Sequence, residues 1–175
     1  APVRQGVTCH ILGQDGVAMA PGSLATIDYM RRYTAGFNGN FPTPDFTWSS
    51  IEEYLNVFKG HCAINAATLI PNGNIRMDVM GLETRPPTPH ELKEMRRRVR
   101  KGMEEGAVGL SSGLDYIPSR YADTEELIAL CEEIAPFGGI YVTHMRGYNL
   151  EKVIESMEEV ERIGREAGCA VHISQ

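Results

Sequence analysis

The feature that most constrains the fold is an alternation of short apolar runs with amphipathic segments of helical length. The apolar runs, rich in Val, Ile and Ala, lie at residues 7–13, 62–70, 107–112, 140–144 and 170–174. Such alternation is typical of βαβ units around a parallel sheet, whose strands are apolar because helices or loops cover both faces. The sequence therefore predicts an α/β fold with five parallel strands in sequential order.

Four helices are predicted between these strands. The clearest start signal is Thr88, followed by Pro89 in the first turn and by Glu91 at the third position of a capping box. The other helices are predicted at residues 49–59, from Asp123 or Thr124 to about Ile134, and after Asn149. The last one carries Val153, Ile154, Met157, Val160 and Ile163 on one face and ends at Gly168. Residues 14–48, rich in Gly, Pro and Thr, are predicted to form a long loop.

Composition limits the class of protein. The chain has a formal net charge of -6 and a pI near 5.4, which opposes a phosphate-backbone partner, so no nucleic acid is expected. No apolar run approaches the length of a membrane span, and the opening residues lack the order of a signal peptide, so the chain is predicted to be cytoplasmic. The four cysteines form no C-x-x-C pair and are predicted to be buried apolar side chains.

The absence of a composition break predicts one continuous unit over residues 1–175. Either a doubly wound sheet or part of a (β/α)8 barrel fits the alternation. Neither G-x-G-x-x-G nor G-x-x-x-x-G-K-[ST] occurs, which disfavours the nucleotide-binding forms of the open sheet.

Both architectures place function at the carboxyl ends of the strands, where a few polar side chains fall. They are Asp15, Tyr116, His144 and Arg146, with Gln175 at the end of the fifth run. This combination suits a metal site beside an oxyanion or carboxylate pocket. Each also has an ordinary structural interpretation: Asp15 can make a turn, His144 can hydrogen-bond in a packed layer, and Tyr116 can be a rim aromatic.

Four segments resemble the N-acyl-D-amino-acid deacylases, or D-aminoacylases, of the amidohydrolase superfamily. They are QGVT at 5–8, GQDG at 13–16, GLSSGLDY at 109–116 and THMR at 143–146. The resemblance implies a zinc-binding (β/α)8 barrel that hydrolyses the amide bond of N-acyl-D-amino acids. Residues 7–13 then match the second strand of that barrel and residues 170–174 the sixth, so the chain is expected to be an incomplete TIM-type barrel segment.

The resemblance also assigns site residues. His144 matches a zinc ligand on the fifth strand, Asp15 stands where many members have a metal-binding Cys, and Gln175 falls where a ligand His is expected. Tyr116 and Arg146 match positions near the substrate pocket. The first-strand His-x-His and the eighth-strand Asp, the general base, have no counterpart in this chain. No catalytic residue is therefore assigned, and the isolated chain is expected to be inactive.

Two alternatives differ in chemistry. A cyclic-amide hydrolase such as a dihydroorotase keeps the superfamily, but Ser111 and Ser112 stand where those enzymes have a carbamylated lysine, which favours the deacylase. A non-catalytic domain that kept the fold and lost the metal site fits Asp15 and Gln175.

Because the first and last strands lack barrel neighbours, self-association through exposed sheet edges is also expected.

Overall fold

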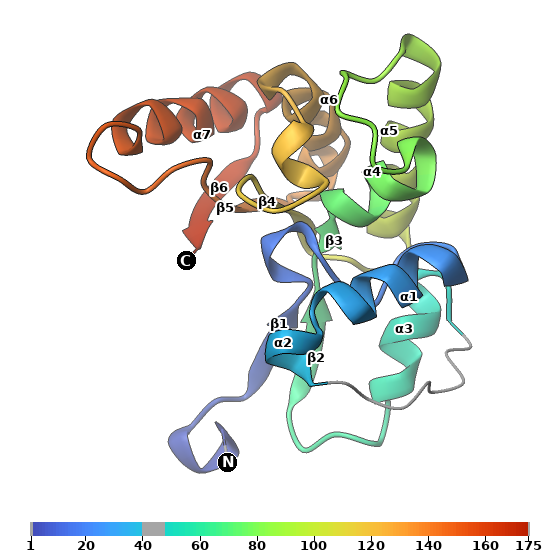
Figure 1. The fold of residues 1–175 in the computed structure, drawn as a ribbon. Helices are drawn as coiled ribbons and strands as arrows, with labels where there is room; N and C mark the ends of the chain where they lie inside the picture. The colour runs from blue at the N-terminus through green and yellow to red at the C-terminus, as the bar shows by residue number, and fades with distance from the viewer. Residues whose placement is uncertain (1, 40–47, 175) are drawn as a thin grey trace.

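The computed structural model describes residues 2–39 and 48–174 (Figure 1). The strands are β1 (Cys9–Leu12), β2 (Asn65–Thr68), β3 (Ile70–Pro71), β4 (Gly109–Gly113), β5 (Ile140–His144) and β6 (Ala170–Ser174). The helices are α1 (Leu24–Tyr33), α2 (Ala35–Asn38), α3 (Ile51–Phe58), α4 (Asn72–Met80), α5 (Pro89–Glu104), α6 (Thr124–Ile134) and α7 (Val153–Ala167). Short 3-10 turns lie at η1 (Pro2–Gln5), η2 (Gln14–Gly16), η3 (Ser119–Tyr121) and η4 (Ala135–Phe137). Parallel strands alternate with helices, which confirms the predicted α/β class.

The described strands pair in the order β1-β2 and β3-β4-β5-β6, and each pair is parallel. The two groups meet at Leu69, whose amide donates to the Leu12 carbonyl at 2.9 Å. The adjacent Thr68 carbonyl accepts from the Val108 amide at 2.9 Å, on the β4 side. The single strand predicted at residues 62–70 was therefore wrong: it is two short strands that start later. A bend changes the partner of each backbone group but not the apolar character of the run, so periodicity cannot reveal it.

One hydrophobic core lies between the strands and α3 to α7. Its buried members include Ile51, Ile70, Met95, Val99, Leu110, Leu127, Leu130, Tyr141 and Ile163. The predicted helix starts are confirmed at α5, where Thr88 and Glu91 form a capping box, and at α6, where Asp123 accepts from the Glu126 amide at 2.8 Å. These caps satisfy amides that the helices leave unpaired.

Two parts of the helix prediction were wrong. Residues 14–39 are not mainly a loop, because α1 and α2 lie within them and Ser23 caps α1; residues 40–47 of the predicted loop lie outside the described residues. Helix α4 was not predicted at all. It opens with Asn72, Gly73 and Asn74, residue types with poor helix propensity, and these are buried against neighbouring elements instead. At α4, tertiary packing therefore outweighs local preference, whereas α1 has a local start signal in Ser23 that the prediction missed.

The apolar face of α7, the last helix, is less buried than the sequence predicted. Val160 and Ile163 are buried, whereas Ile154 is 61% exposed and Met157 is 47% exposed. The helix also begins at Val153 instead of directly after Asn149. Among the cysteines, Cys131 is buried and Cys169 partly buried, but Cys9 and Cys62 are exposed, so burial of all four was also wrong.

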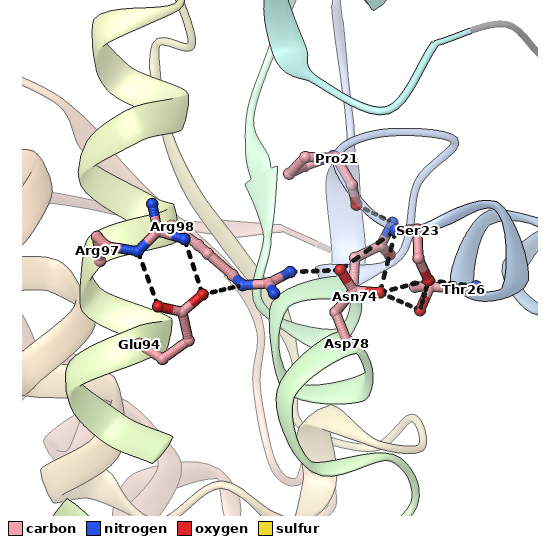
Figure 2. A network of polar contacts seen from close by, with 8 residues as sticks. All are labelled: Pro21, Ser23, Thr26, Asn74, Asp78, Glu94, Arg97 and Arg98. Carbon is pink, nitrogen blue, oxygen red and sulfur yellow. Dashed lines mark hydrogen bonds and ion pairs between the residues drawn. The ribbon is translucent and has the colours of Figure 1, made fainter. Parts of the chain in front are cut away.

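A polar network around Asp78 of α4 connects the segment after η2 to α5 (Figure 2). The Asp78 carboxylate accepts from the Ser23 hydroxyl at 2.7 Å and the Thr26 hydroxyl at 2.5 Å. It also forms an ion pair with Arg98, which in turn contacts Glu94 at 2.8 Å. Burial raises the pKa of Asp78, but these hydrogen bonds and the Arg98 charge outweigh it and lower that pKa.

Beside Asp78, the side chain of Asn74 holds the chain that leads from η2 into α1. Its amide donates to the Ala18 carbonyl at 2.9 Å and the Pro21 carbonyl at 3.0 Å. The hydrogen bonds of Asn74 therefore hold this segment against α4.

Within the described ranges, no helix is both long and apolar enough to cross a bilayer.

Candidate functional site

The turn that follows β1 presents Asp15 in a conformation uncommon for a residue with a side chain. Its backbone is left-handed, with φ 58° and ψ 24°. Ser111 of β4 holds this turn: its hydroxyl donates to the Gly13 carbonyl at 2.5 Å and accepts from the Gly16 amide at 3.2 Å. Non-glycine residues with positive φ are rare and concentrate at functional sites. Asp15 is thus held at the carboxyl end of β4.

Gly113, the last residue of β4, makes room for this approach. A Cβ atom at Gly113 would lie 2.2 Å from the Asp15 carbonyl oxygen and 2.4 Å from Cδ2 of Tyr116. Both distances are far inside van der Waals contact, so a side chain here would displace the turn and the Tyr116 ring. The glycine therefore allows Asp15 and Tyr116 to meet over the end of the strand.

His144 ends β5, in register with Gly113 on one side and Ser174 on the other. Its ring lies between Tyr116 and Tyr148, with centroid separations of 4.9 and 4.7 Å. The His144 Nδ1 atom is buried and has no hydrogen-bond partner within the part of the chain that the structure describes. A buried, unpartnered nitrogen calls for an explanation, and a missing ligand is one.

Tyr148 connects the ends of β5 and β6. Its hydroxyl donates to the Ser174 carbonyl at 2.5 Å and accepts from the Met145 amide at 2.9 Å. The Ser174 hydroxyl in turn donates to Asp15 Oδ1 at 3.3 Å. The segments after β1 and β5 are therefore linked to the last residue of β6 around the His144 imidazole, so Asp15 and His144 lie at the same, carboxyl end of the strands.

Tyr116 is suited to donating a hydrogen bond. Burial, together with the negative charges of Asp15 and Asp115, raises the pKa of its phenol. The phenol is therefore protonated at neutral pH. Its ring already contacts His144, so a group bound at His144 would lie next to Tyr116.

Arg146 is engaged with the protein itself. Its guanidinium forms an ion pair with Glu159 of α7 at 2.9 Å and donates to the carbonyls of Arg120 and Ala122 at 3.0 and 2.9 Å. Burial would lower the pKa of Arg146, but the Glu159 carboxylate outweighs this and raises it. Arg146 therefore holds the loop after β5 against α7 and the turn η3.

Donor chemistry at this end of the sheet is compatible with zinc, which binds imidazole nitrogen and carboxylate oxygen. Asp15 and His144 supply one donor group of each kind. Over residues 2–39 and 48–174, no group of three or more His, Cys, Asp or Glu side chains could hold a metal ion. Gln175, the third predicted metal position, lies outside the described residues.

Four residues of this arrangement were not singled out from the sequence as organising the site: Ser111, Gly113, Tyr148 and Ser174. The signal for Ser111 and Gly113 was their place at a strand end opposite a turn that contains two glycines. Tyr148 had no such signal, because its contacts depend on how the loop after β5 folds back.

Curated relatives match nearly the whole chain. From Alcaligenes xylosoxydans xylosoxydans, a D-aminoacylase is 33% identical over 98% of this chain, and an N-acyl-D-aspartate deacylase is 30% identical over 98%. An N-acyl-D-glutamate deacylase from the same organism is 29% identical over 97%. The chain spans about a third of the length of these relatives, 33–34%. No family model matches it.

Solved structures agree over the same extent. The crystal structure of a D-aminoacylase, described as defining a novel subset of amidohydrolases, superimposes with a TM-score of 0.82 at 31% identity, over 99% of this chain and 35% of that one. An N-acyl-D-glutamate deacylase from Bordetella bronchiseptica, complexed with zinc and a phosphonate inhibitor, gives 0.80 at 29% identity, over 97% and 34%. A further D-aminoacylase, studied for its binuclear metal center, gives 0.82 at 30% identity, over 99% and 35%.

Proposed function

We infer the function from family membership: this chain belongs to the D-aminoacylase family, of whose sequences it spans about a third. We propose that residues 1–175 are one segment, strands two to six, of a (β/α)8 barrel in a longer zinc-dependent enzyme. That enzyme would hydrolyse the amide bond of N-acyl-D-amino acids, yielding a carboxylate and a free D-amino acid. The sequential parallel strand order supports this proposal, since barrels of this class are built by repeating that unit.

The observation that carries the proposal is the convergence of three separate segments on one point. Asp15 comes from the turn after β1, Tyr116 from the loop after β4, and His144 from the end of β5. Function in parallel α/β architectures is located at this end of the strands. An orphaned imidazole nitrogen at the centre of the group supports a bound ligand there.

We assign roles by position at the strand ends. Asp15 and His144 would hold the zinc, with Gln175 at the third position although an amide is a poor zinc ligand. Zinc held by these residues would supply Lewis-acid chemistry, polarising the substrate carbonyl and making water more acidic. Tyr116 donates a hydrogen bond to the substrate amide oxygen or carboxylate. Arg146, engaged by Glu159, is a positioning residue that fixes the loop carrying Tyr148.

The isolated chain is expected to show no turnover. Catalytic zinc sites use three protein ligands and one open position, and this chain offers Asp15, His144 and the weak donor Gln175. No residue here is assigned to accept a proton, and positioned acid–base groups contribute about 10²–10⁴-fold to rate.

The test compares zinc content and hydrolysis of N-acetyl-D-amino acids in the longer enzyme and in the isolated chain. His144→Ala in the longer enzyme should remove both zinc and activity. The matched control is His90→Ala, because His90 is exposed in the first turn of α5, away from the strand ends. Retention of zinc and hydrolysis in His144→Ala would overturn the assignment. Turnover by the isolated chain would overturn the claim that residues 1–175 alone are inactive. A longer protein that binds no zinc would favour the non-catalytic alternative.

A further inference from the structure

Tyr148, in the loop after β5, contacts His144 directly and reaches Asp15 through one intermediate residue. Its ring centroid lies 4.7 Å from that of His144. Its hydroxyl donates to the Ser174 carbonyl at 2.5 Å, and the Ser174 hydroxyl donates to Asp15 Oδ1 at 3.3 Å. The two donor groups predicted to hold zinc are therefore connected through Tyr148.

The Tyr148 hydroxyl is fully engaged within the protein. It donates its hydrogen to the Ser174 carbonyl and accepts from the Met145 amide at 2.9 Å. A phenol has one hydrogen to donate, so none is left for a substrate atom. Tyr148 therefore differs from Tyr116, to which the proposed function gives a hydrogen bond to the substrate. The contacts of Tyr148 act on other residues of the protein instead.

The loop after β5 folds back and carries Tyr148 over the strand ends. A Cβ atom at Gly147 would lie 2.8 Å from Cβ of Lys152, so a side chain at Gly147 would force the loop apart. The Asn149 side chain accepts from the Lys152 amide at 3.0 Å and closes the turn before α7. These local contacts hold the Tyr148 ring beside His144.

These contacts give the two donor groups a defined orientation. The last torsion of a histidine or an aspartate has a broad energy minimum, so the planes of the His144 ring and the Asp15 carboxylate need support from neighbours. Packing between the rings of Tyr116 and Tyr148 limits rotation of the imidazole. The bond from Ser174 to Asp15 is long and therefore weaker, so the ring contact with His144 carries more of the effect.

We propose that Tyr148 is a positioning residue that sets the placement of Asp15 and His144 relative to each other for metal binding. This inference rests on the proposed function and adds to it a residue that touches neither the metal nor the substrate. Residues that orient the ligands of a metal ion contribute about 10–100-fold to its affinity. Removal of Tyr148 contacts should therefore weaken zinc binding within that range.

The test uses the longer enzyme with zinc alone as the probe. Chelator competition measures zinc affinity, visible absorption of the cobalt-substituted enzyme reports on ligand geometry, and thermal unfolding reports on the fold. Tyr148→Phe keeps the ring but removes both hydrogen bonds of the hydroxyl, and it should weaken zinc binding about tenfold and change the cobalt absorption. Tyr148→Leu also removes the ring and should weaken zinc binding about 100-fold. Ser174→Ala keeps Tyr148 and should have a smaller effect than Tyr148→Phe.

The matched control is Tyr141→Phe, on the opposite face of β5. Tyr141 is fully buried, and its hydroxyl forms a hydrogen bond with the Ser112 hydroxyl at 2.6 Å. Side chains alternate between the two faces of a strand, so Tyr141 lies in the core beneath the helices and His144 on the other side. Tyr141→Phe should lower the unfolding temperature but leave zinc affinity and cobalt absorption unchanged.

A merely structural Tyr148 would behave as Tyr141 does. Normal zinc affinity in Tyr148→Phe or in Ser174→Ala would overturn the inference, whatever the unfolding temperatures of these variants. If His144→Ala loses zinc in the same experiment, the proposed function survives that outcome. A longer protein that binds no zinc, or that keeps zinc in His144→Ala, would overturn the proposed function and this inference with it.

Discussion

The centre and the margins of the sheet contain strands of similar length but differ in environment. All five residues of β4 are buried, whereas four of the five residues of β6 are exposed and the fifth is only partly buried. The difference lies in neighbours, since β4 pairs with β3 and β5, but β6 pairs with β5 alone among the described strands. Apolar character thus predicts a strand, and position in the sheet decides its burial. The candidate site residues Ser111 and His144 belong to β4 and β5, the better-packed pair.

The largest expected change in stability comes from removing a buried ion pair between two helices that cover the central strands. Arg76 of α4 and Glu126 of α6 form an ion pair in which neither side chain is exposed, and Arg76 also donates to the Arg85 carbonyl at 2.6 Å. Burial raises the pKa of Glu126 despite Arg76. Arg76→Met leaves Glu126 buried without its partner and should lower the free energy of unfolding by about 3–5 kcal/mol. Urea unfolding measures this.

The matched control is Arg165→Met. Arg165 pairs with Glu161 at 2.9 Å on α7, where both side chains are largely exposed. Exposed pairs contribute less than about 1 kcal/mol. Equal losses in the two variants would show that the buried pair has no special weight.

A second test compares apolar truncations in the two regions. Leu110 of β4 is fully buried, and Ile173 of β6 is 40% exposed. Leu110→Ala should cost about 2–5 kcal/mol because it removes buried surface and leaves a cavity. Ile173→Ala should cost less than about 1 kcal/mol. Similar changes in urea midpoint for both variants would mean that β6 is covered in solution.

The same contrast explains how much of the fold could be predicted. The strand class, the order and the capped helices α5 and α6 follow from local periodicity and from Thr88 and Asp123. The bend at Leu69 and the start of α4 do not, because long-range partners determine them. Exposure of Ile154 could not be predicted either, since a helical face is buried only where another element covers it.

For the candidate site, the prediction identified the polar residues at strand ends but not what holds them. Asp15, Tyr116 and His144 lie together because parallel strands end on one side, and their roles stay predictions. The contacts that organise them come from Ser111 and Tyr148, and their partners lie up to 98 residues away in sequence. Arg146 pairs with Glu159, a contact that no local pattern indicates, and its place near a substrate stays a prediction.

A third test concerns the polar network around Asp78, which joins the segment after η2 to α5. The folded-state pKa of Asp78 lies below its ordinary value of 3.8. Its contribution to stability is therefore complete above pH 3.8 and is lost as pH falls through the lower folded-state value. Asp78→Asn should lower the free energy of unfolding by about 1.5–3 kcal/mol at neutral pH and flatten the acid dependence.

Thermal unfolding between pH 7 and pH 2 measures both effects. Glu151→Gln, at an exposed residue before α7, is the control and should change the free energy of unfolding at neutral pH by less than about 0.5 kcal/mol. An acid slope that persists in Asp78→Asn would assign the loss of stability to other carboxyls.

The smallest expected effect is at the margins themselves. Ile11 of β1 is 51% exposed, and Val171 and Ile173 of β6 are each 40% exposed. Both strands also have one edge that pairs with no other strand among the described residues. Exposed strand edges recruit other strands, and we therefore expect weak, concentration-dependent self-association of the chain. Ile173→Lys should weaken it by about tenfold, or 1.4 kcal/mol, because charged residues on edge strands oppose pairing. Sedimentation velocity over a concentration series measures the change, and Val108→Lys, 38% exposed but not on an outer strand, is the control. A chain that stays a monodisperse monomer at high concentration would show that its margins are protected in solution, and the contrast with the centre would then be one of burial alone.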